Sequence, residues 1–413
     1  MTGCRVGHEA PTGGPASGLL SRNRSFLLLW IGQFVSQLGD RLAIVAFPWV
    51  VYTSTNSPVD TGAVLALYTA PYVLFGASAG VLIDRLNKRT IMVIADLARA
   101  GLVLLVPAVA AHSLIPVYVL SFAISTAAVF FEPSRLAILP DLVRQDQLMR
   151  VNSLMAAGEN ATEVLGYVLA GLTVAALSTE TAFRLDAVTF VASAAALWAM
   201  RYAVPNVASG HRSAPSFWTQ LREGIGFLVR ERALLLNTLV TVCFAAGLGA
   251  SYPLTFLLAV DVLNAGARGF GLMEAAIGLG YLLGSVALAA LASRVRRGWA
   301  MIGGWAVMGV SLAVVGSTSN IWQACAAFLV FGTANSAALI AIDTYLLATV
   351  PERLRGRVFG VRFTVTQGIY ALSVIIGAAM AGFAGTRTLL LLSGGLMLLT
   401  GLSAALLRDI SDA

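Results

Sequence analysis

The sequence predicts an all-α membrane protein of about twelve transmembrane helices, built as two pseudo-symmetric halves of six helices each. The first indication is composition. The chain has 413 residues, of which 58% are hydrophobic and 11% are charged, whereas soluble domains carry roughly 25% charged residues. The second is a series of apolar runs along the whole chain, and the third is a short internal repeat at half the chain length.

Each apolar run is near the length of about 20 residues that a helix needs to cross the hydrocarbon core. In the first half the runs cover approximately residues 26–53, 62–82, 90–111, 114–134, 151–177 and 181–202. In the second half they cover approximately residues 234–260, 270–292, 299–317, 321–346, 358–383 and 388–407. The runs thus form two sets of equal size.

Positive charges predict how the spans are oriented. They precede the first run and follow every second run after it, whereas the alternate loops carry only Arg184, Arg268 and Arg387. Because loops rich in arginine stay in the cytoplasm, both termini are expected there. The expected location is the bacterial cytoplasmic (inner) membrane. The expected domains are a tail (1–24), a first bundle (25–203), a linker (204–233), a second bundle (234–408) and a short tail (409–413).

The linker and the repeat both support this division. The segment before Val151 aligns without gaps to the segment before Val358, and each follows the fourth run of its half. Within the linker, Phe217 to Arg230 has its apolar residues at helical spacing. Two interpretations are open for this amphipathic helix: it lies on the inner membrane surface, or it is a plain soluble linker.

Composition also excludes several classes of protein. The arginines lie in loops, not in a stripe on a soluble domain, which argues against nucleic-acid binding. A phosphate loop needs a lysine after a glycine, but Lys88, the only lysine, follows Asn87, so no nucleotide site is expected. The histidines and cysteines are scattered, which predicts no metal site. No enzyme activity and no cofactor are expected.

One loop carries a distinctive pattern at the end of the second run. Residues 80–89 read GVLIDRLNKR, which resembles the signature loop of the major facilitator superfamily, G-x-x-x-D-R-x-G-R-[RK]. Asn87 and Lys88 depart from it, standing where glycine and arginine are usual. The residues matched are Gly80, Asp84, Arg85, Lys88 and Arg89.

The resemblance implies a conformational lock. Asp84 would face the N-terminal end of the eleventh span, where the helix dipole favours an anion. Lys88 would pair with an acid near the fourth span, and Glu132 is the candidate. These contacts would stabilise the outward-open state.

Further segments resemble the drug- and natural-product-exporter branch of the same superfamily, which holds macrolide efflux proteins and the enterobactin exporter. They are LGDR at 38–41, AFPW at 46–49, ADLAR at 95–99, FEPSR at 131–135 and RGRVFG at 355–360. The resemblance covers nearly the whole chain.

Charged and polar residues inside the runs are the candidates for proton coupling or substrate binding, because a charge in the bilayer needs a partner or a wet cavity. Asp96 and Arg99 are one turn apart and suit an internal ion pair. For Asp40, a functional role and neutralisation by Arg41 are both open. Glu159 and Glu163 share one helix face, so one of them is expected to stay protonated. The full set is Gln37, Asp40, Arg41, Asp96, Arg99, Glu159, Glu163, Glu274 and Asp343.

Aromatic residues within the runs either line a cavity or pack in the bundle. The candidates are Tyr68, Tyr72, Tyr252, Tyr281, Tyr345 and Tyr370, together with Trp305.

The sequence therefore predicts a secondary active transporter that exports a hydrophobic or amphipathic small molecule by proton antiport with alternating access. Its partners would be a small organic substrate, protons and membrane lipid, and it would act as a monomer. A lipid or lysolipid flippase, a siderophore exporter and an uptake permease on the same fold are the alternatives.

Overall fold

The structure is a computed structural model that describes residues 23–83, 86–110, 112–202, 217–291 and 297–405. These ranges are helical apart from short turns, and they contain no strand. Asp84 and Arg85 of the signature loop lie outside the described residues.

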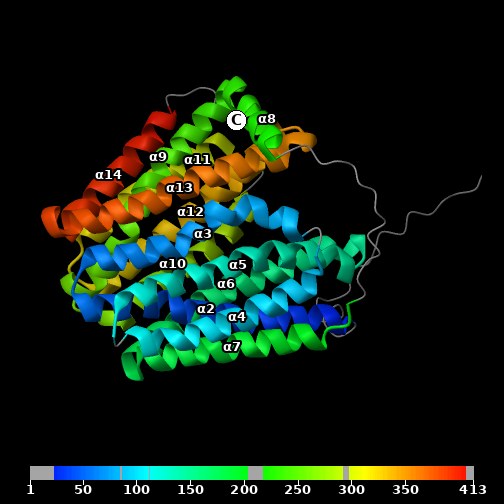
Figure 1. Cartoon of the computed structure of the whole chain (residues 1–413). Helices are drawn as coiled ribbons and strands as arrows, with labels where there is room; N and C mark the ends of the chain where they lie inside the picture. Colours follow the sequence, from blue (N-terminus) through cyan, green and yellow to red (C-terminus); the bar gives the residue numbers. More distant parts are fainter. Residues whose placement is uncertain (1–22, 84–85, 111, 203–216, 292–296, 406–413) are drawn as a thin grey trace, which may run out of the picture.

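Six long helices form the first half and six form the second. The first half consists of α2 (Arg24–Thr55), α3 (Pro58–Ile83), α4 (Lys88–Ala110), α5 (Leu114–Leu142), α6 (Leu148–Ala176) and α7 (Thr179–Ala199). The second half consists of α9 (Arg232–Leu257), α10 (Gly266–Leu291), α11 (Arg297–Ser317), α12 (Ile321–Thr349), α13 (Glu352–Ala384) and α14 (Thr386–Ala405). This confirms the predicted fold class, and Figure 1 shows the long helices of the two halves running along a common axis.

Eleven of these helices are long and apolar enough to cross a membrane. The remaining one, α6, has 29 residues and packs against α2 and α10, but it carries Arg150, Glu159 and Glu163. Many large apolar side chains face outward, among them Leu74, Ile115 and Trp198. A soluble monomer rarely exposes so much apolar surface, which identifies the outer face as the one in contact with lipid.

Polar residues at the helix ends make the short turns possible. The side chain of Ser178 accepts a hydrogen bond from the backbone of Thr181 (3.0 Å), and that of Asn320 accepts one from Trp322 (2.8 Å). Such caps satisfy backbone donors that the first turn of a helix leaves free. Asn56 ends α2 in the left-handed conformation with φ 52°, which asparagine tolerates better than most residues.

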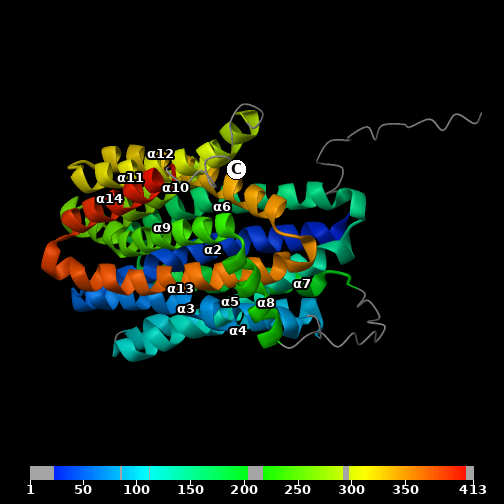
Figure 2. The same cartoon turned by 90° about the horizontal axis from the view of Figure 1, so that it is seen from above.

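The two halves meet mainly through two helix pairs, α6 with α10 and α3 with α13. Figures 1 and 2 both show α3 and α13 running side by side. Glycines permit the closest approach between α6 and α10. A Cβ atom on Gly271 would lie 2.6 Å from the carbonyl oxygen of Tyr167 and 2.8 Å from the Cα atom of Gly171.

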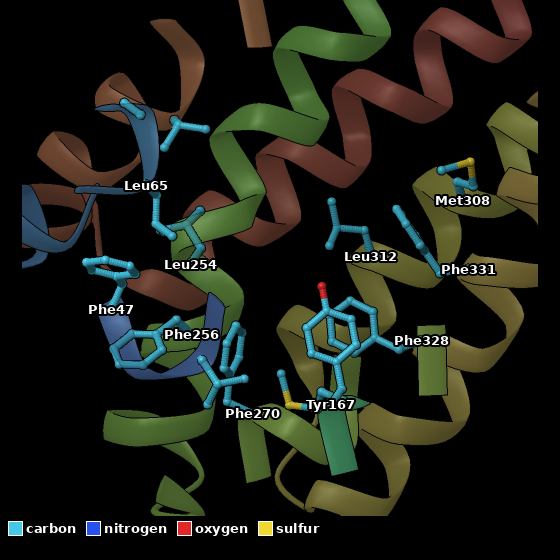
Figure 3. Packing of buried hydrophobic residues seen from close by; sticks show 14 of the residues in the cluster. Phe47, Leu65, Tyr167, Leu254, Phe256, Phe270, Met308, Leu312, Phe328 and Phe331 are labelled. Carbon is cyan, nitrogen blue, oxygen red and sulfur yellow. The ribbon is translucent and has the colours of Figure 1, made fainter. Parts of the chain in front are cut away.

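At one end of the bundle an aromatic and polar seal joins the halves. The hydroxyl of Tyr52 on α2 donates to Asp261 (2.5 Å), in the short π-helix η2 (Leu258–Val262). Trp49 packs edge-on against Phe256, with ring centroids 6.3 Å apart. Figure 3 shows Phe256 and Phe270 beside Phe47 in this packed region. At the opposite end, Asn23 donates to the Leu142 carbonyl (2.8 Å) and Ser25 donates to the Arg201 carbonyl (3.0 Å). Because Arg144 and Arg201 lie in the described connections there, we call it the arginine-rich end.

The linker helix α8 (Phe217–Arg230) packs against α13 and α9. Leu228 is buried, and a Cβ atom on Gly224 would lie 2.8 Å from the carbonyl oxygen of Arg357. Glu223 forms an ion pair with Arg357. The predicted amphipathic helix is therefore present, and part of its surface packs on the second half.

Candidate functional site

A cavity lies between the two halves and has three connected parts. A polar part of about 380 Å³ is lined by α2, α3, α4, α5 and α6 of the first half. A second part of about 300 Å³ is lined largely by the second half and holds most of the aromatic rings. Both parts share Arg41, Ile44 and Glu163. A smaller part of about 130 Å³ joins them through Ile44, Tyr68, Tyr252 and Tyr370.

The exposed fractions of the carboxylates show where the cavity opens. The side chains of Glu132 and Glu159 are 42% and 41% exposed, whereas Glu274 is only 7% exposed. Glu132 and Glu159 lie on the halves of α5 and α6 that are nearer the α5–α6 connection, and thus nearer the arginine-rich end. The cavity therefore opens toward that end and is closed by the Tyr52–Asp261 seal at the other.

Arg135 organises the mouth of the polar part. Its guanidinium contacts Glu132 at 2.8 Å and Glu159 at 2.7 Å, although Arg135 itself is buried. The apolar run ends near Pro133, which predicts that Arg135 lies in a loop, but α5 continues through Pro133 and Pro140. A proline removes one backbone hydrogen bond without ending a helix that its neighbours support.

A second ion-pair group lies deeper, centred on Arg99 of α4. Arg99 forms the expected ion pair with Asp96 and also reaches Asp40 of α2 at 3.5 Å. The guanidinium lies between the rings of Phe131 and Phe190, at 4.8 Å and 4.2 Å from their centroids. Asp40 thus has Arg99, from another helix, as its closest cation partner.

Arg41 points away from Asp40, toward α6. It donates to the hydroxyl of Tyr167 (3.3 Å) and lies over that ring, 5.1 Å from its centroid. Gly166 provides the space, because a Cβ atom there would lie 2.7 Å from Cγ of Arg41. Gln37 lies one turn before Arg41 on α2 and accepts a hydrogen bond from Thr162 of α6 (2.9 Å). These contacts fix α2 against α6 beside the cavity.

The aromatic part contains several of the tyrosines that the sequence singled out. Tyr252, Tyr281 and Tyr370 line it, and Figure 3 shows Tyr167 of α6 projecting among Leu312, Phe328 and Phe331 of the second half. Tyr68 and Tyr72 line the polar part.

Glu274 lies in the aromatic part with no side-chain hydrogen bond or ion pair to any other described residue. It is therefore an unpaired carboxyl group among aromatic rings.

Four candidates fall outside the cavity, and one of them is Asp96, which is buried beside Arg99. Tyr345 is buried in the hydrophobic core, as is Trp305, which packs beside Phe244. Asp343 is exposed on α12. Near it, Arg362 of α13 is buried and donates to Asn237 (2.9 Å) and Thr238.

In the conformation described, which opens toward the arginine-rich end, Lys88 does not contact its expected partner Glu132, and the pairing expected for the outward-open state stays a prediction. Lys88 pairs with Asp141 (2.8 Å) and donates to the Ala137 carbonyl (2.9 Å), whereas Glu132 pairs with Arg135. Glu132 lies more than two turns before Asp141 on α5. Its side chain lines the polar part of the cavity and does not reach Lys88. Tyr202 also donates to Asp141 (2.9 Å), and burial together with this bond raises the pKa of Tyr202 to about 12.

Arg89 ties the start of α4 to the end of α7. It donates to the carbonyls of Leu197 (2.9 Å) and Trp198, and it lies 5.4 Å from the centroid of the Trp198 ring. The described part of the signature loop therefore fastens α4 to α5 and α7 within the first half. Gly80 belongs to the last turns of α3.

The residues predicted for the site do not include three buried charges, Arg135, Asp186 and Arg362. Asp186 had a visible signal, since it is an acid within the apolar run at 181–202. Arg135 and Arg362 lie near the predicted ends of their runs, where an arginine is expected in a loop.

Comparison with known proteins agrees with this architecture. Residues 18–410 match the family model described as transmembrane secretion effector. The chain is 26% identical to an uncharacterized MFS-type transporter, YfiS, of Bacillus subtilis, with 96% of each chain covered. It is 24% identical to macrolide efflux protein A of Streptococcus pyogenes, covering 93% of this chain and 96% of that protein. It is 25% identical to the multidrug efflux pump Tap of Mycolicibacterium fortuitum, covering 94% and 96%.

Solved structures with low sequence identity share the fold. The nucleoside transporter NupG superposes with a TM-score of 0.75 at 13% identity, covering 92% of this chain and 98% of that one. A bacterial homologue of the iron transporter ferroportin, in an inward-facing state, gives 0.69 at 15% identity, covering 92% and 98%. Because the family model matches nearly the whole length of the chain, the chain belongs to the transmembrane secretion effector family of the major facilitator superfamily.

Proposed function

We propose that this protein exports an amphipathic organic molecule across the bacterial cytoplasmic membrane in exchange for protons. The observation that carries this proposal is the cavity between the halves, which combines a charged part with an aromatic part. A molecule with one polar and one apolar end matches both. The names of the efflux relatives support export of drugs or natural products.

The carboxylates of the cavity support proton coupling. Asp40, Glu163 and Glu274 all line it, and membrane-embedded acids are the usual carriers of protons in transporters. One proton moving across 100 mV supplies about 2.3 kcal/mol, and one unit of pH difference supplies about 1.4 kcal/mol. Either is enough to concentrate a substrate by a factor of ten or more.

The open and closed ends of the cavity support a mechanism of alternating access. The cavity opens at the arginine-rich end, which the charge distribution predicts to be cytoplasmic. An exporter loads its substrate from that side. Opening the other end requires the Tyr52–Asp261 bond to break and the α6–α10 contact to loosen.

Everted membrane vesicles test the proposal, using ethidium and erythromycin as probes. Vesicles that contain the protein should accumulate a probe when respiration acidifies their interior, and a protonophore should abolish the accumulation. Vesicles from cells without the protein are the control. Accumulation that survives the protonophore, or that matches the control for both probes, would contradict proton-driven export.

Glu274 gives a prediction about substrate charge. It is an unpaired carboxyl group among tyrosine rings, which can ionise when an organic cation binds beside it, and carboxylates and ring faces both attract such a cation. Glu274→Gln is therefore expected to weaken ethidium binding roughly tenfold, with less effect on a neutral probe such as chloramphenicol. Binding to the purified protein measures this.

The matched control for this prediction is Glu180→Gln, which changes an exposed acid paired with Arg184 at the surface. Equal losses for the cationic and the neutral probe would show that Glu274 supports the fold and not the recognition of charge.

A further inference from the structure

A buried acid of α7, Asp186, lies behind Asp40 and is not among the residues that line the cavity. Asp186 is fully buried, and neither of its carboxyl oxygens has a hydrogen-bond partner. The nearest hydroxyl, on Thr189, donates to the backbone carbonyl of Asp186 (2.7 Å). The carboxyl group therefore has only the Thr189 hydroxyl beside it, which is engaged with the backbone, and no cation in contact among the described residues.

Close packing places Asp186 against the functional part of α2. A Cβ atom on Gly39 would lie 2.5 Å from Oδ1 of Asp186 and 2.0 Å from the hydroxyl of Thr189. Only a glycine allows α2 to approach α7 this closely. Because Gly39 directly precedes Asp40, the two carboxyl groups are neighbours across the α2–α7 contact.

Arg99 completes the group. Phe190, one turn after Asp186 on α7, has its ring against the Arg99 guanidinium (4.2 Å), which brings Asp186 within electrostatic range of that cation. The helices that pack on α7 bring Asp40 from α2, and Asp96 and Arg99 from α4. From α3, Tyr68 also faces the group.

The count of charges is unequal. Three carboxyl groups lie around the Arg99 guanidinium, which contacts Asp96 and Asp40, and the only other cation among the described residues that acts on them is Arg41, which affects Asp40 without contacting it. An ionised carboxylate that is buried without a partner is strongly disfavoured, and carboxyl groups that share a site hold a proton between them. The group that lacks any partner, Asp186, is the natural holder of this proton.

We propose that Asp186 stores the coupling proton, which it exchanges with Asp40, the acid that faces the cavity. This inference rests on the proposed proton antiport. In the transfer, the O–H bond of Asp186 breaks and the proton bonds to a carboxylate oxygen of Asp40. Arg99 then exchanges its contact with Asp40 for one with Asp186, so the total charge of the group is unchanged. Asp40 in turn releases the proton to the water-filled polar part.

Infrared spectroscopy of the purified full-length protein tests the storage step without any substrate. A protonated carboxylic acid absorbs infrared light at a different frequency from an ionised carboxylate. The wild type is expected to show a buried carboxylic acid band that weakens as the pH is raised and that appears in the difference between the wild-type and Asp186→Asn spectra, whereas bands from Glu163 and Glu274 are common to both and cancel. Asp343→Asn, which alters an exposed acid of the second half, should keep it. If the band persists in Asp186→Asn, or if it never responds to pH, the storage role is overturned.

Transport in everted vesicles with ethidium as the probe tests the coupling step. Asp186→Asn is expected to retain exchange of labelled for unlabelled ethidium. Its accumulation of ethidium against a gradient should be at least tenfold lower than that of the wild type. Accumulation equal to the wild type would overturn the proposal. If Asp186→Asn is not recovered as folded protein, Asp186→Glu takes its place, and it should retain both the carboxylic acid band and accumulation.

The two proposals fail in distinguishable ways. If the wild type itself is insensitive to the proton gradient, the proposed antiport fails. If the wild type is coupled and Asp186→Asn is equally coupled, only the assignment of Asp186 fails.

Discussion

Replacing Asp40 by asparagine is expected to abolish export against a gradient while leaving substrate binding within about twofold of the wild type. Asp40 is 27% exposed in the polar part of the cavity and contacts Arg99 at 3.5 Å. It is therefore the acid of the Arg99 group that can reach both water and the buried interior. Asparagine keeps the shape but cannot carry a proton. At a pH difference of one unit, the roughly tenfold accumulation that coupling supplies should disappear.

Accumulation in everted vesicles and equilibrium binding measure the two halves of this prediction. Asp146→Asn, in the exposed α5–α6 connection, is the control and should behave as the wild type. The competing role for Asp40 is that it only neutralises Arg99. In that case the double substitution of Asp40→Asn with Arg99→Gln would restore accumulation, and restoration would remove Asp40 from the coupling mechanism.

Gly271→Leu should reduce transport by at least tenfold although the protein inserts and folds. A Cβ atom at this position meets backbone atoms of Tyr167 and Gly171 at 2.6 Å and 2.8 Å. Backbone atoms cannot move aside as a flexible side chain can, so α10 must separate from α6 at this contact. The conformation that is open toward the arginine-rich end then becomes inaccessible, because it requires this contact.

The accessibility of Asn160, which lines the polar part, reports this change. In a background without Cys4, Cys243 and Cys325, a cysteine placed at Asn160 should react from the arginine-rich side in the wild type and far more slowly in Gly271→Leu. Gly303→Leu is the matched control, because nothing lies within 4 Å of a Cβ atom there. Unchanged labelling and transport in Gly271→Leu would show that the contact is not needed for the cycle.

Local features of the site could be predicted from the sequence, whereas contacts between helices could not. The Asp96–Arg99 pair follows from its i,i+3 spacing on one helix. The partners of Asp40, Lys88 and Glu159 all lie on other helices. Which residue meets which depends on the rotation and depth of each helix, and nearly uniform apolar runs carry little information about either.

The limits of the spans were also harder to predict than their number. Composition and arginine placement were enough to place the two sets of six helices. The apolar run predicts that the helix ends about two turns before the observed end of α5, because a proline and an arginine such as Pro133 and Arg135 are typical of a loop. Arg135 is stable inside because two carboxylates, Glu132 and Glu159, neutralise it. Such compensation is visible only once the helices are packed.

The most direct test of proton-coupled export is substrate-driven proton movement in proteoliposomes of the purified protein. An outward gradient of the transported probe is imposed with no initial difference in pH, and a dye reports the internal pH. Proton antiport predicts that the interior becomes acidic as the probe leaves, and that Asp40→Asn lets any probe movement proceed without acidification. Probe leaving through the wild-type protein with no change in internal pH would contradict proton antiport.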